Sequence, residues 1–196
     1  MHPSTTVSPL AYGAQSMTAP LQTVLMKAPG EPFGRAFDDP AHGYRHPVDL
    51  ALARRQHADL LTLLERLGVT VHMLDAESSS PDLVYIFDTA LITDRGAIVL
   101  RSGKATRVGE ERLVEAWFRE VGVPVLGRVT VPGTIDGGDC LWLAPELLCV
   151  GRSLRTNDAG IAQLGALLSD VEVRAFDLPY GGGPSECLPC CPSSRR

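Results

Sequence analysis

The sequence predicts an α/β fold made of repeated ββαβ modules of about fifty residues. Residues 85–129 and residues 134–178 each contain two strand-like segments, a helix-like segment and a final strand-like segment, in that order. The two stretches align without gaps at an offset of 48 residues, which places Asp88 opposite Asp136. This period is typical of propeller blades and solenoid repeats, whose modules bury their faces against one another.

The first part of the chain predicts a shorter copy of the module. Residues 21–29 alternate between apolar and polar side chains like a strand and end at a Pro-Gly pair. After a loop rich in Gly, Pro and Asp, residues 48–68 predict a helix with Gly68 at the expected C-cap. One face of this helix carries Leu50, Ala53, His57, Leu60, Leu61, Leu64 and Leu67. The sequence VTVHML then forms a strand, so about three modules are expected in total.

Each of the two full modules has its elements in a predictable order. In the first, the strands VYIFDTALIT and AIVLR flank the turn DRG, and the helix EERLVEAWFREVG leads to the strand VPVLGRV. In the second, TIDGGDCLWL and LLCVG flank the turn APE, and the helix DAGIAQLGALLSD leads to the strand VEVRAFDL. One acid precedes each strand pair and one arginine, Arg107 or Arg155, precedes each helix.

The composition predicts one soluble globular domain. Apolar residues make up 44% of the 196 residues and charged residues 21%, as in ordinary globular chains. The net charge is −5 and the basic residues are not clustered, so neither nucleic acid nor a membrane is an expected partner. We expect a disordered lead over 1–19, a single incomplete α/β domain over 20–188 and an aberrant tail over 189–196. The lead has no secretory signal, which favours a cytoplasmic location with reduced cysteines.

Four acids lie at predicted strand entrances, beside prolines and glycines that let a ligand approach the backbone: Asp82, Asp88, Asp136 and Asp139. If the modules pack around an axis, these entrances converge, and carboxylates that face one another need a cation between them. A guanidinium fits better than a metal, because carboxylates bind it through paired hydrogen bonds and no histidine accompanies the acids. Arg107 and Arg155 then suit the carboxylate end of an amino-acid-like ligand. No metal and no cofactor are predicted.

Ordinary structural roles are the competing interpretation of these residues. Any of the acids can serve as a turn or cap residue, and we assign Asp94, Asp158 and Asp170 to that role. Surface arginines are common as well. The acid and the arginine both keep register between the modules, however, which favours a shared site.

The motifs FDTALIT…GKATR, IDGGD, GRSLRTN and FDLPYGGGPSECL resemble the guanidine-modifying enzyme superfamily, which includes dimethylarginine dimethylaminohydrolase, arginine deiminase and amidinotransferase. The resemblance covers residues 21–188 and implies a five-bladed α/β propeller (pentein) of ββαβ modules, of which about three are present. It also implies that Asp82, Asp88 and Asp136 hold a guanidinium group, and that Arg107 and Arg155 hold the carboxylate end of the substrate. Phe87 stands where methylarginine hydrolases have a second acid, so the guanidino substrate stays open, as does hydrolysis against amidino transfer.

The resemblance implies a cysteine nucleophile and a histidine that protonates the departing amine. The histidine directly follows the ECL motif, and this position is Pro189; none of the five cysteines matches the nucleophile. We therefore expect no catalysis by this chain. The tail PCCPSSRR favours a frameshift or truncation after Cys187. A metal site at Cys187, Cys190 and Cys191 is disfavoured, because it supplies three ligands and no partner pair upstream.

Two other functions stay open. The chain can be a non-catalytic module that binds a guanidino ligand through Asp88, Asp136 and the two arginines. It can also be a structural fragment whose tail docks a partner. An incomplete propeller exposes strand edges, so self-association is expected as well.

Overall fold

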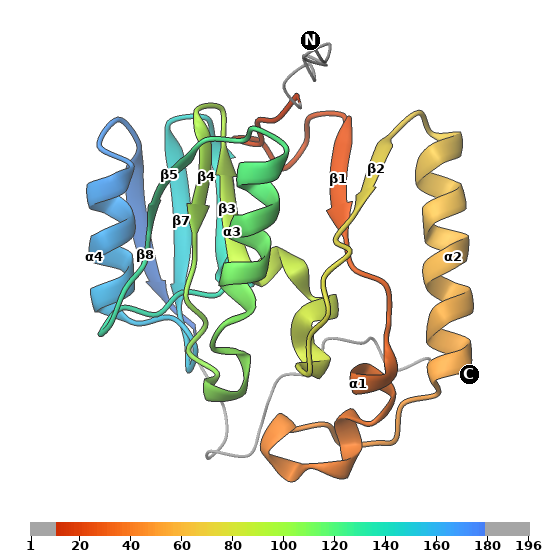
Figure 1. The fold of residues 1–196 in the computed structure, drawn as a ribbon. Helices are drawn as coiled ribbons and strands as arrows, with labels where there is room; N and C mark the ends of the chain where they lie inside the picture. Colours follow the sequence, from red (N-terminus) through yellow and green to blue (C-terminus); the bar gives the residue numbers. More distant parts are fainter. Residues whose placement is uncertain (1–10, 179–196) are drawn as a thin grey trace, which may run out of the picture.

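The computed structural model describes residues 11–178 (Figure 1). The expectations for residues 1–10, for Pro189 and for the cysteines of the tail lie outside the described residues. In the described part of the predicted lead, residues 11–20 contain no helix or strand. Gln15 nevertheless reaches two hairpin turns, because its Oε1 accepts from the Asp94 amide at 2.9 Å and its Nε2 donates to the Pro145 carbonyl at 2.6 Å.

The first module has two parallel strands joined through a long helix. Strand β1 (Thr23–Met26) pairs with β2 (Thr70–Met73), with Thr23 opposite Thr70. Helix α2 (Leu50–Arg66) connects them, and the Asp49 side chain caps it by accepting from the Leu52 amide at 2.8 Å. The short helix α1 (Glu31–Gly34) and two 3-10 turns, Ala36–Asp38 and Pro40–His42, form the intervening loop.

The second and third modules confirm the predicted ββαβ order. In the second sheet, β3 (Ala90–Thr93) and β4 (Gly96–Val99) form a hairpin, and β5 (Val125–Arg128) runs parallel to β4 after helix α3 (Glu110–Glu120). In the third sheet, β6 (Cys140–Ala144) and β7 (Leu147–Arg152) form the hairpin, and β8 (Glu172–Asp177) runs parallel to β7 after helix α4 (Asp158–Leu167). β4 and β7 are the central strands.

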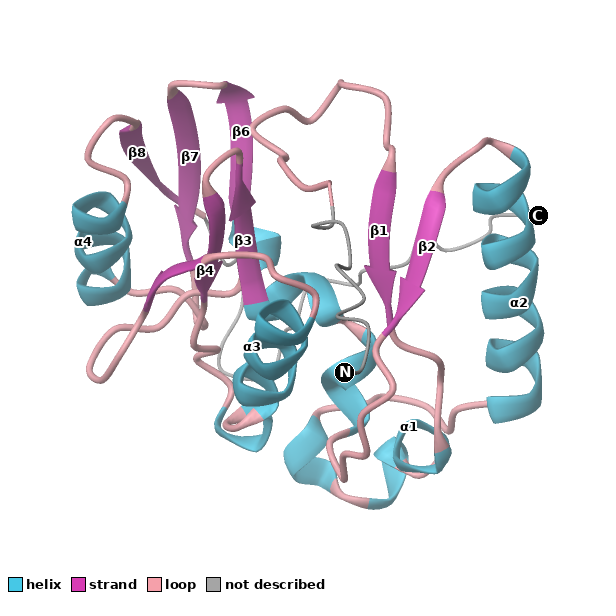
Figure 2. Ribbon diagram, turned by 45° about the horizontal axis from the view of Figure 1, so that its top comes forward, coloured by secondary structure: helices cyan, strands magenta, loops and turns pink. Residues whose placement is uncertain are grey.

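The three sheets stand side by side, with the longest helix, α2, at one end of the row and α4 at the other (Figures 1 and 2). Two apolar clusters join them. Val114 and Phe118 of α3 pack with Ala97 of β4 and with Leu74, which follows β2. Leu164 of α4 and its C-cap residue Leu168 pack with apolar residues of both the second and the third sheet. Each of these helices therefore links its own sheet to the preceding module, as expected of a stacked repeat.

The gapless offset of 48 residues was wrong for the two hairpin strands, whereas the last strands keep it, because Val125 of β5 pairs with Ala97 and Val173 of β8 pairs with Leu148. Ala90 pairs with Val99 and Cys140 pairs with Val150, so the two hairpins are offset by 50 residues in one strand and 51 in the other. The helices keep the offset of 48, because α3 starts at 110 and α4 at 158. The loop between strand and helix is about three residues longer in the second module. Asp88 and Asp136 are therefore not equivalent positions in the fold.

The third sheet leaves large apolar side chains exposed. Leu143 of β6 is 60% exposed and Phe176 of β8 is 51% exposed, whereas Leu148 of the central strand β7 is fully buried. The sheets are open, and the mixed α/β fold built from ββαβ modules is confirmed. The expected self-association stays a prediction. Among the described helices, none is both long and apolar enough to cross a membrane.

Candidate functional site

The segments that carry the predicted acids are 3-10 helices rather than strand ends. Pro81–Val84 and Ile86–Thr89 are such helices, so the strand predicted from Val84 begins only at Ala90. The Ser80 hydroxyl accepts from the Asp82 amide, and the Tyr85 amide donates to the Asp82 carbonyl at 2.9 Å. These local hydrogen bonds compete with the extended conformation that the apolar pattern favoured.

The corresponding segments of the two full modules pack directly against each other. The 3-10 helix Gly137–Asp139 lies beside the one that contains Asp88, and the Gly138 amide donates to Oδ1 of Asp88 at 2.9 Å. A Cβ atom at Gly137 would lie 2.1 Å from the Phe87 carbonyl oxygen, so only glycine allows this approach. The IDGGD motif thus brings Asp136 next to Asp88, although the two residues are not equivalent in the fold.

Asp82 is buried and bound by side chains from distant parts of the chain. Its carboxylate accepts from the Tyr44 hydroxyl at 3.0 Å and from the Lys104 ammonium, which also donates to the His42 carbonyl at 2.6 Å. Only 4% of Asp82 is exposed. Burial, together with the neighbouring Asp82, raises the pKa of Tyr44 far above its ordinary value. Asp82 therefore already has a cation of the protein as its partner.

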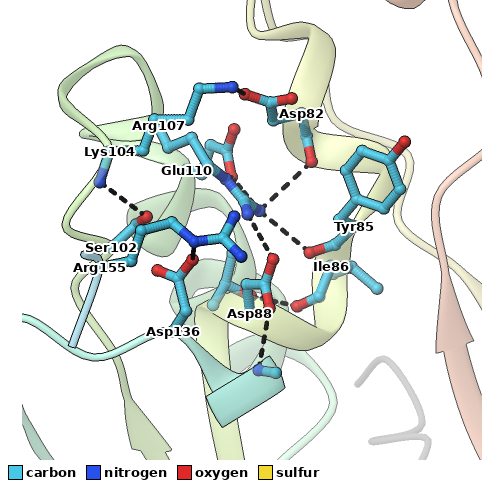
Figure 3. A network of polar contacts seen from close by, with 12 residues as sticks. Asp82, Tyr85, Ile86, Asp88, Ser102, Lys104, Arg107, Glu110, Asp136 and Arg155 are labelled. Atoms are coloured by element: carbon cyan, nitrogen blue, oxygen red, sulfur yellow. Dashed lines mark hydrogen bonds and ion pairs between the residues drawn. The ribbon is translucent and has the colours of Figure 1, made fainter. Parts of the chain in front are cut away.

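Arg107 is the centre of a buried network that also contains Asp88 and Glu110 (Figure 3). Its Nε donates to Glu110 at 2.8 Å, one terminal nitrogen donates to Asp88, and the other donates to the Tyr85 carbonyl at 3.0 Å. Burial alone would lower the pKa of Arg107, but the bonds to Glu110 and Asp88 raise it above its ordinary value. The Ser80 hydroxyl donates to the other oxygen of Glu110. Arg107 stays charged and immobile.

Asp136 and Arg155 form a second pair with different properties. Nε of Arg155 lies 2.9 Å from Oδ2 of Asp136, and 43% of the arginine side chain is exposed. Asp136 itself is completely buried, and neither of its carboxylate oxygens has a hydrogen-bond partner of good geometry among the described residues. Burial raises the pKa of Asp136, while Ser102 and Arg155 act in the opposite direction.

Asp139 has a local role in the loop that precedes α4. It accepts from the hydroxyls of Ser153 and Thr156 at 2.6 Å each. Thr156 in turn accepts from the Asp136 amide at 3.1 Å. These hydrogen bonds fix the segment that carries Arg155. Asp139 therefore stabilises the loop but forms no ion pair with either arginine of the cluster.

The structure therefore brings Asp88, Arg107, Asp136 and Arg155 into one polar cluster, with Asp82 at its edge (Figure 3). Sequence reasoning missed three residues that complete it: Tyr44, Lys104 and Glu110. Glu110 had a recognisable signal, because it lies three residues after Arg107 at the start of a helix. Tyr44 had none, since it reaches Asp82 from 38 residues away.

The described residues offer no metal site at this cluster. Among residues 11–178, no group of three or more His, Cys, Asp or Glu side chains is placed to hold a metal ion. An open hollow of about 640 Å³ lies at the loops that follow β1 and β2, and its lining includes none of the six predicted site residues. The polar cluster is therefore the candidate site.

Comparisons with known proteins agree with this fold. No family model matches the chain. An N(G),N(G)-dimethylarginine dimethylaminohydrolase of Pseudomonas aeruginosa is 32% identical over 120 residues, which is 61% of this chain and 47% of that protein. The same enzyme of Streptomyces coelicolor is 33% identical over 138 residues, 70% of this chain and 53% of that protein. The chain thus spans about half the length of these curated relatives.

A solved structure gives the same result. The P. aeruginosa enzyme, as a C249S mutant complexed with citrulline, superposes with a TM-score of 0.72 and 26% identity, covering 81% of this chain and 62% of that one. The modules and these similarities define a protein of the guanidine-modifying class. The chain belongs to the guanidine-modifying enzyme superfamily, which confirms the resemblance seen in its motifs. The ligand-binding roles of the individual acids and arginines stay predictions.

Asp136 makes a testable contribution to the pH dependence of stability. Because its pKa is raised above the ordinary 3.8, the folded protein keeps a proton that the unfolded chain has already released. The free energy of unfolding should therefore fall as pH rises from about 4 through the raised pKa. We expect Asp136→Asn to flatten this fall, measured by urea unfolding at several pH values between about 4 and 7. An unchanged slope in Asp136→Asn would contradict the assignment.

Proposed function

We propose that this chain carries the substrate-recognition part of an enzyme that acts on a guanidino compound by hydrolysis or amidino transfer. The observation that carries the proposal is Asp136, a fully buried carboxylate without a well-aligned hydrogen-bond donor, which lies beside Asp88 and the half-exposed Arg155. A planar guanidinium offers paired donors to such carboxylates. Arginine-like ligands also have a carboxylate that an exposed arginine can bind.

The resemblance to the superfamily implies which groups the chemistry needs. A cysteine thiolate forms a bond to the guanidinium carbon, the bond from that carbon to the leaving amine breaks, and a histidine gives the amine its proton. Water or an acceptor amine then displaces the sulfur from the amidino group. Pro189 occupies the position of the histidine, and none of the five cysteines matches the nucleophile. The loss of both groups typically costs on the order of 10⁶ in rate.

We expect the purified 196-residue chain to bind arginine or a methylarginine without converting it. Calorimetry measures the binding, and an assay for citrulline, ornithine or released amine measures turnover. Asp136→Asn should weaken the binding, because it removes the charge that faces the guanidinium. Asp170→Asn, which changes an exposed acid paired with Arg95, is the matched control and should bind like the parent. Measurable turnover would contradict the expected inactivity, and absent binding would contradict the proposed site.

A non-catalytic ligand-binding role is the second candidate, and the residue at Pro189 favours it. Such a module would use the same cluster only to bind a guanidino ligand. Both proposals predict that the chain binds a guanidino ligand. They differ in whether a longer natural form of the chain converts that ligand. The cytoplasmic location also stays a prediction.

A further inference from the structure

Helices α2 and α3 end in the same way, so their residues can be compared one by one. Each is followed by a glycine with positive φ, Gly68 at 80° and Gly122 at 77°. In both helices the amide of the residue after this glycine donates to the carbonyl five positions earlier, as in a Schellman motif. The two helices therefore align at an offset of 54 residues, the distance in sequence from Gly68 to Gly122.

The apolar face of α3 is covered by the module that precedes it. Val114 is 2% exposed and packs with Leu74, which follows β2. The ring of Trp117 lies edge-on to that of His72 in β2, with the ring centroids 5.8 Å apart. Helix α3 therefore packs on the first sheet as well as on its own.

The equivalent face of α2 has no such cover within the described residues, because α2 stands at one end of the row of sheets (Figure 1). Val114, Trp117 and Val121 of the second module correspond, at the offset of 54 residues, to Leu60, Leu63 and Leu67. These three leucines are between 43% and 70% exposed, and none of the 17 residues of α2 is buried. We call Leu60, Leu63 and Leu67 the leucine face.

The third sheet has an exposed position whose counterpart in the second sheet is covered. Leu91 of β3 is 5% exposed, because it packs in the cluster that joins the second sheet to α4 and the third sheet. The hairpin offset of 50 residues places Leu141 of β6 at the same position, and Leu141 is 43% exposed. Within residues 11–178 no helix follows β8, so no further module covers this side of the sheet.

Two more exposed apolar residues share this side of the third sheet. Leu143 follows Leu141 by two residues in the same strand, and side chains at this spacing point to the same side. Leu141 pairs with Cys149, which pairs with Arg174, and Phe176 follows Arg174 by two residues. We call Leu141, Leu143 and Phe176 the open sheet face.

The leucine face and the open sheet face fit each other by the rule that already builds the chain. Helix α3 packs on the first sheet and α4 on the second, so the leucine face should pack on a sheet and the open sheet face should accept a helix. Residues 179–196 amount to less than half of a module of about fifty residues, so they do not match the size of either cover. A second copy of the chain carries both matching faces.

We propose that copies of this chain associate head to tail, with the leucine face of one copy packed on the open sheet face of the next. The contact between copies repeats the contact between successive modules within one copy. Such an interface is heterologous, so it leaves one face of each kind free and continues into rings or open chains. The burial of large apolar side chains on both faces drives the association. This inference does not depend on ligand binding and goes beyond the proposed function.

Two single variants and their mixture test the arrangement. Sedimentation velocity of the parent at increasing concentrations should show assemblies larger than a monomer. Leu63→Lys places a charge in the leucine face and Phe176→Lys places one in the open sheet face, and neither charge has a partner in the interface. Each variant alone should associate about thirtyfold or more weakly than the parent, as expected for a substitution at the centre of an interface.

An equimolar mixture of the two variants should form a dimer and nothing larger. The leucine face of Phe176→Lys and the open sheet face of Leu63→Lys are both intact, so they make one interface, and the blocked faces prevent a second. A symmetric interface, in which each copy uses the same face, gives no such complementation. A mixture that stays monomeric would therefore overturn the head-to-tail arrangement.

Thr62→Lys is the matched control, because it adds the same charge to an exposed position of α2 that lies about 100° around the helix from Leu63. It should associate like the parent. A parent that stays monomeric at every concentration would overturn the inference, and so would single variants that associate as strongly as the parent. Circular dichroism checks that the variants fold, and Leu60→Lys or Leu141→Lys replaces one that does not.

Discussion

Replacing Arg107 by methionine should lower the free energy of unfolding by about 3–5 kcal/mol. Methionine fills much of the same volume but leaves the buried carboxylate of Glu110 and the partly buried carboxylate of Asp88 without their cation. It also leaves the Tyr85 carbonyl without a donor. Urea unfolding followed by circular dichroism at neutral pH measures the loss. Adding Glu110→Gln to the same chain should restore part of it, because one of the uncompensated charges is then removed.

Arg128→Met is the control for this experiment. Arg128 also pairs with an acid, Glu115, but 53% of its side chain is exposed and Arg119 neutralises the same acid. Glu115 is buried but keeps Arg119 as its partner, so the loss in Arg128→Met should be about 1 kcal/mol or less. A loss below about 1 kcal/mol in Arg107→Met would show that the buried carboxylates do not depend on Arg107.

Leu148→Ala should cost about 2–5 kcal/mol through the cavity that it creates. Leu148 is fully buried in β7, the central strand of the third sheet, and packs in the cluster that joins α4 to the second and third sheets. The surrounding side chains belong to rigid elements and can fill the space only partly. Thermal and urea unfolding of the parent and the variant give the difference.

Leu143→Ala makes the same chemical change at an exposed site. Leu143 is in β6, the strand paired with β7, and is 60% exposed. Its replacement should change the free energy of unfolding by less than about 0.5 kcal/mol. If Leu148→Ala and Leu143→Ala lower the free energy of unfolding equally, the apolar cluster around Leu148 does not stabilise the fold as its burial indicates.

Hydrophobic periodicity was sufficient to predict the modules, because strands and helices here have clear patterns and short turns. It failed at residues 84–89, where apolar residues imitate a strand but Ser80, Pro81 and Asp82 favour 3-10 turns. The offset between modules failed for a related reason. Identical residues at a constant spacing suggested an alignment without gaps. Such an alignment cannot reveal that the loop between strand and helix is about three residues longer in one module, because residues on both sides of the loop match by coincidence.

The sequence was sufficient to predict which residues form the candidate site, but not which acid pairs with which base. The sequence identified Asp88, Asp136, Arg107 and Arg155, all of which meet in one cluster (Figure 3). It could not tell that Arg107 is enclosed while Arg155 is half exposed, because burial depends on the packing of the whole fold. The contacts of Asp82 with Tyr44 and Lys104 come from two separate loops, and their meeting depends on tertiary structure.

The different lengths of the two loops between strand and helix have an evolutionary consequence. The longer loop contributes Lys104 and leads into Arg107, both of which are bonded to acids before any ligand arrives. The shorter loop contains Arg155, whose side chain is 43% exposed although it pairs with the buried Asp136. Substitutions in the shorter loop can therefore change the exposed part of the cluster, whereas substitutions in the longer loop remove partners of its buried acids.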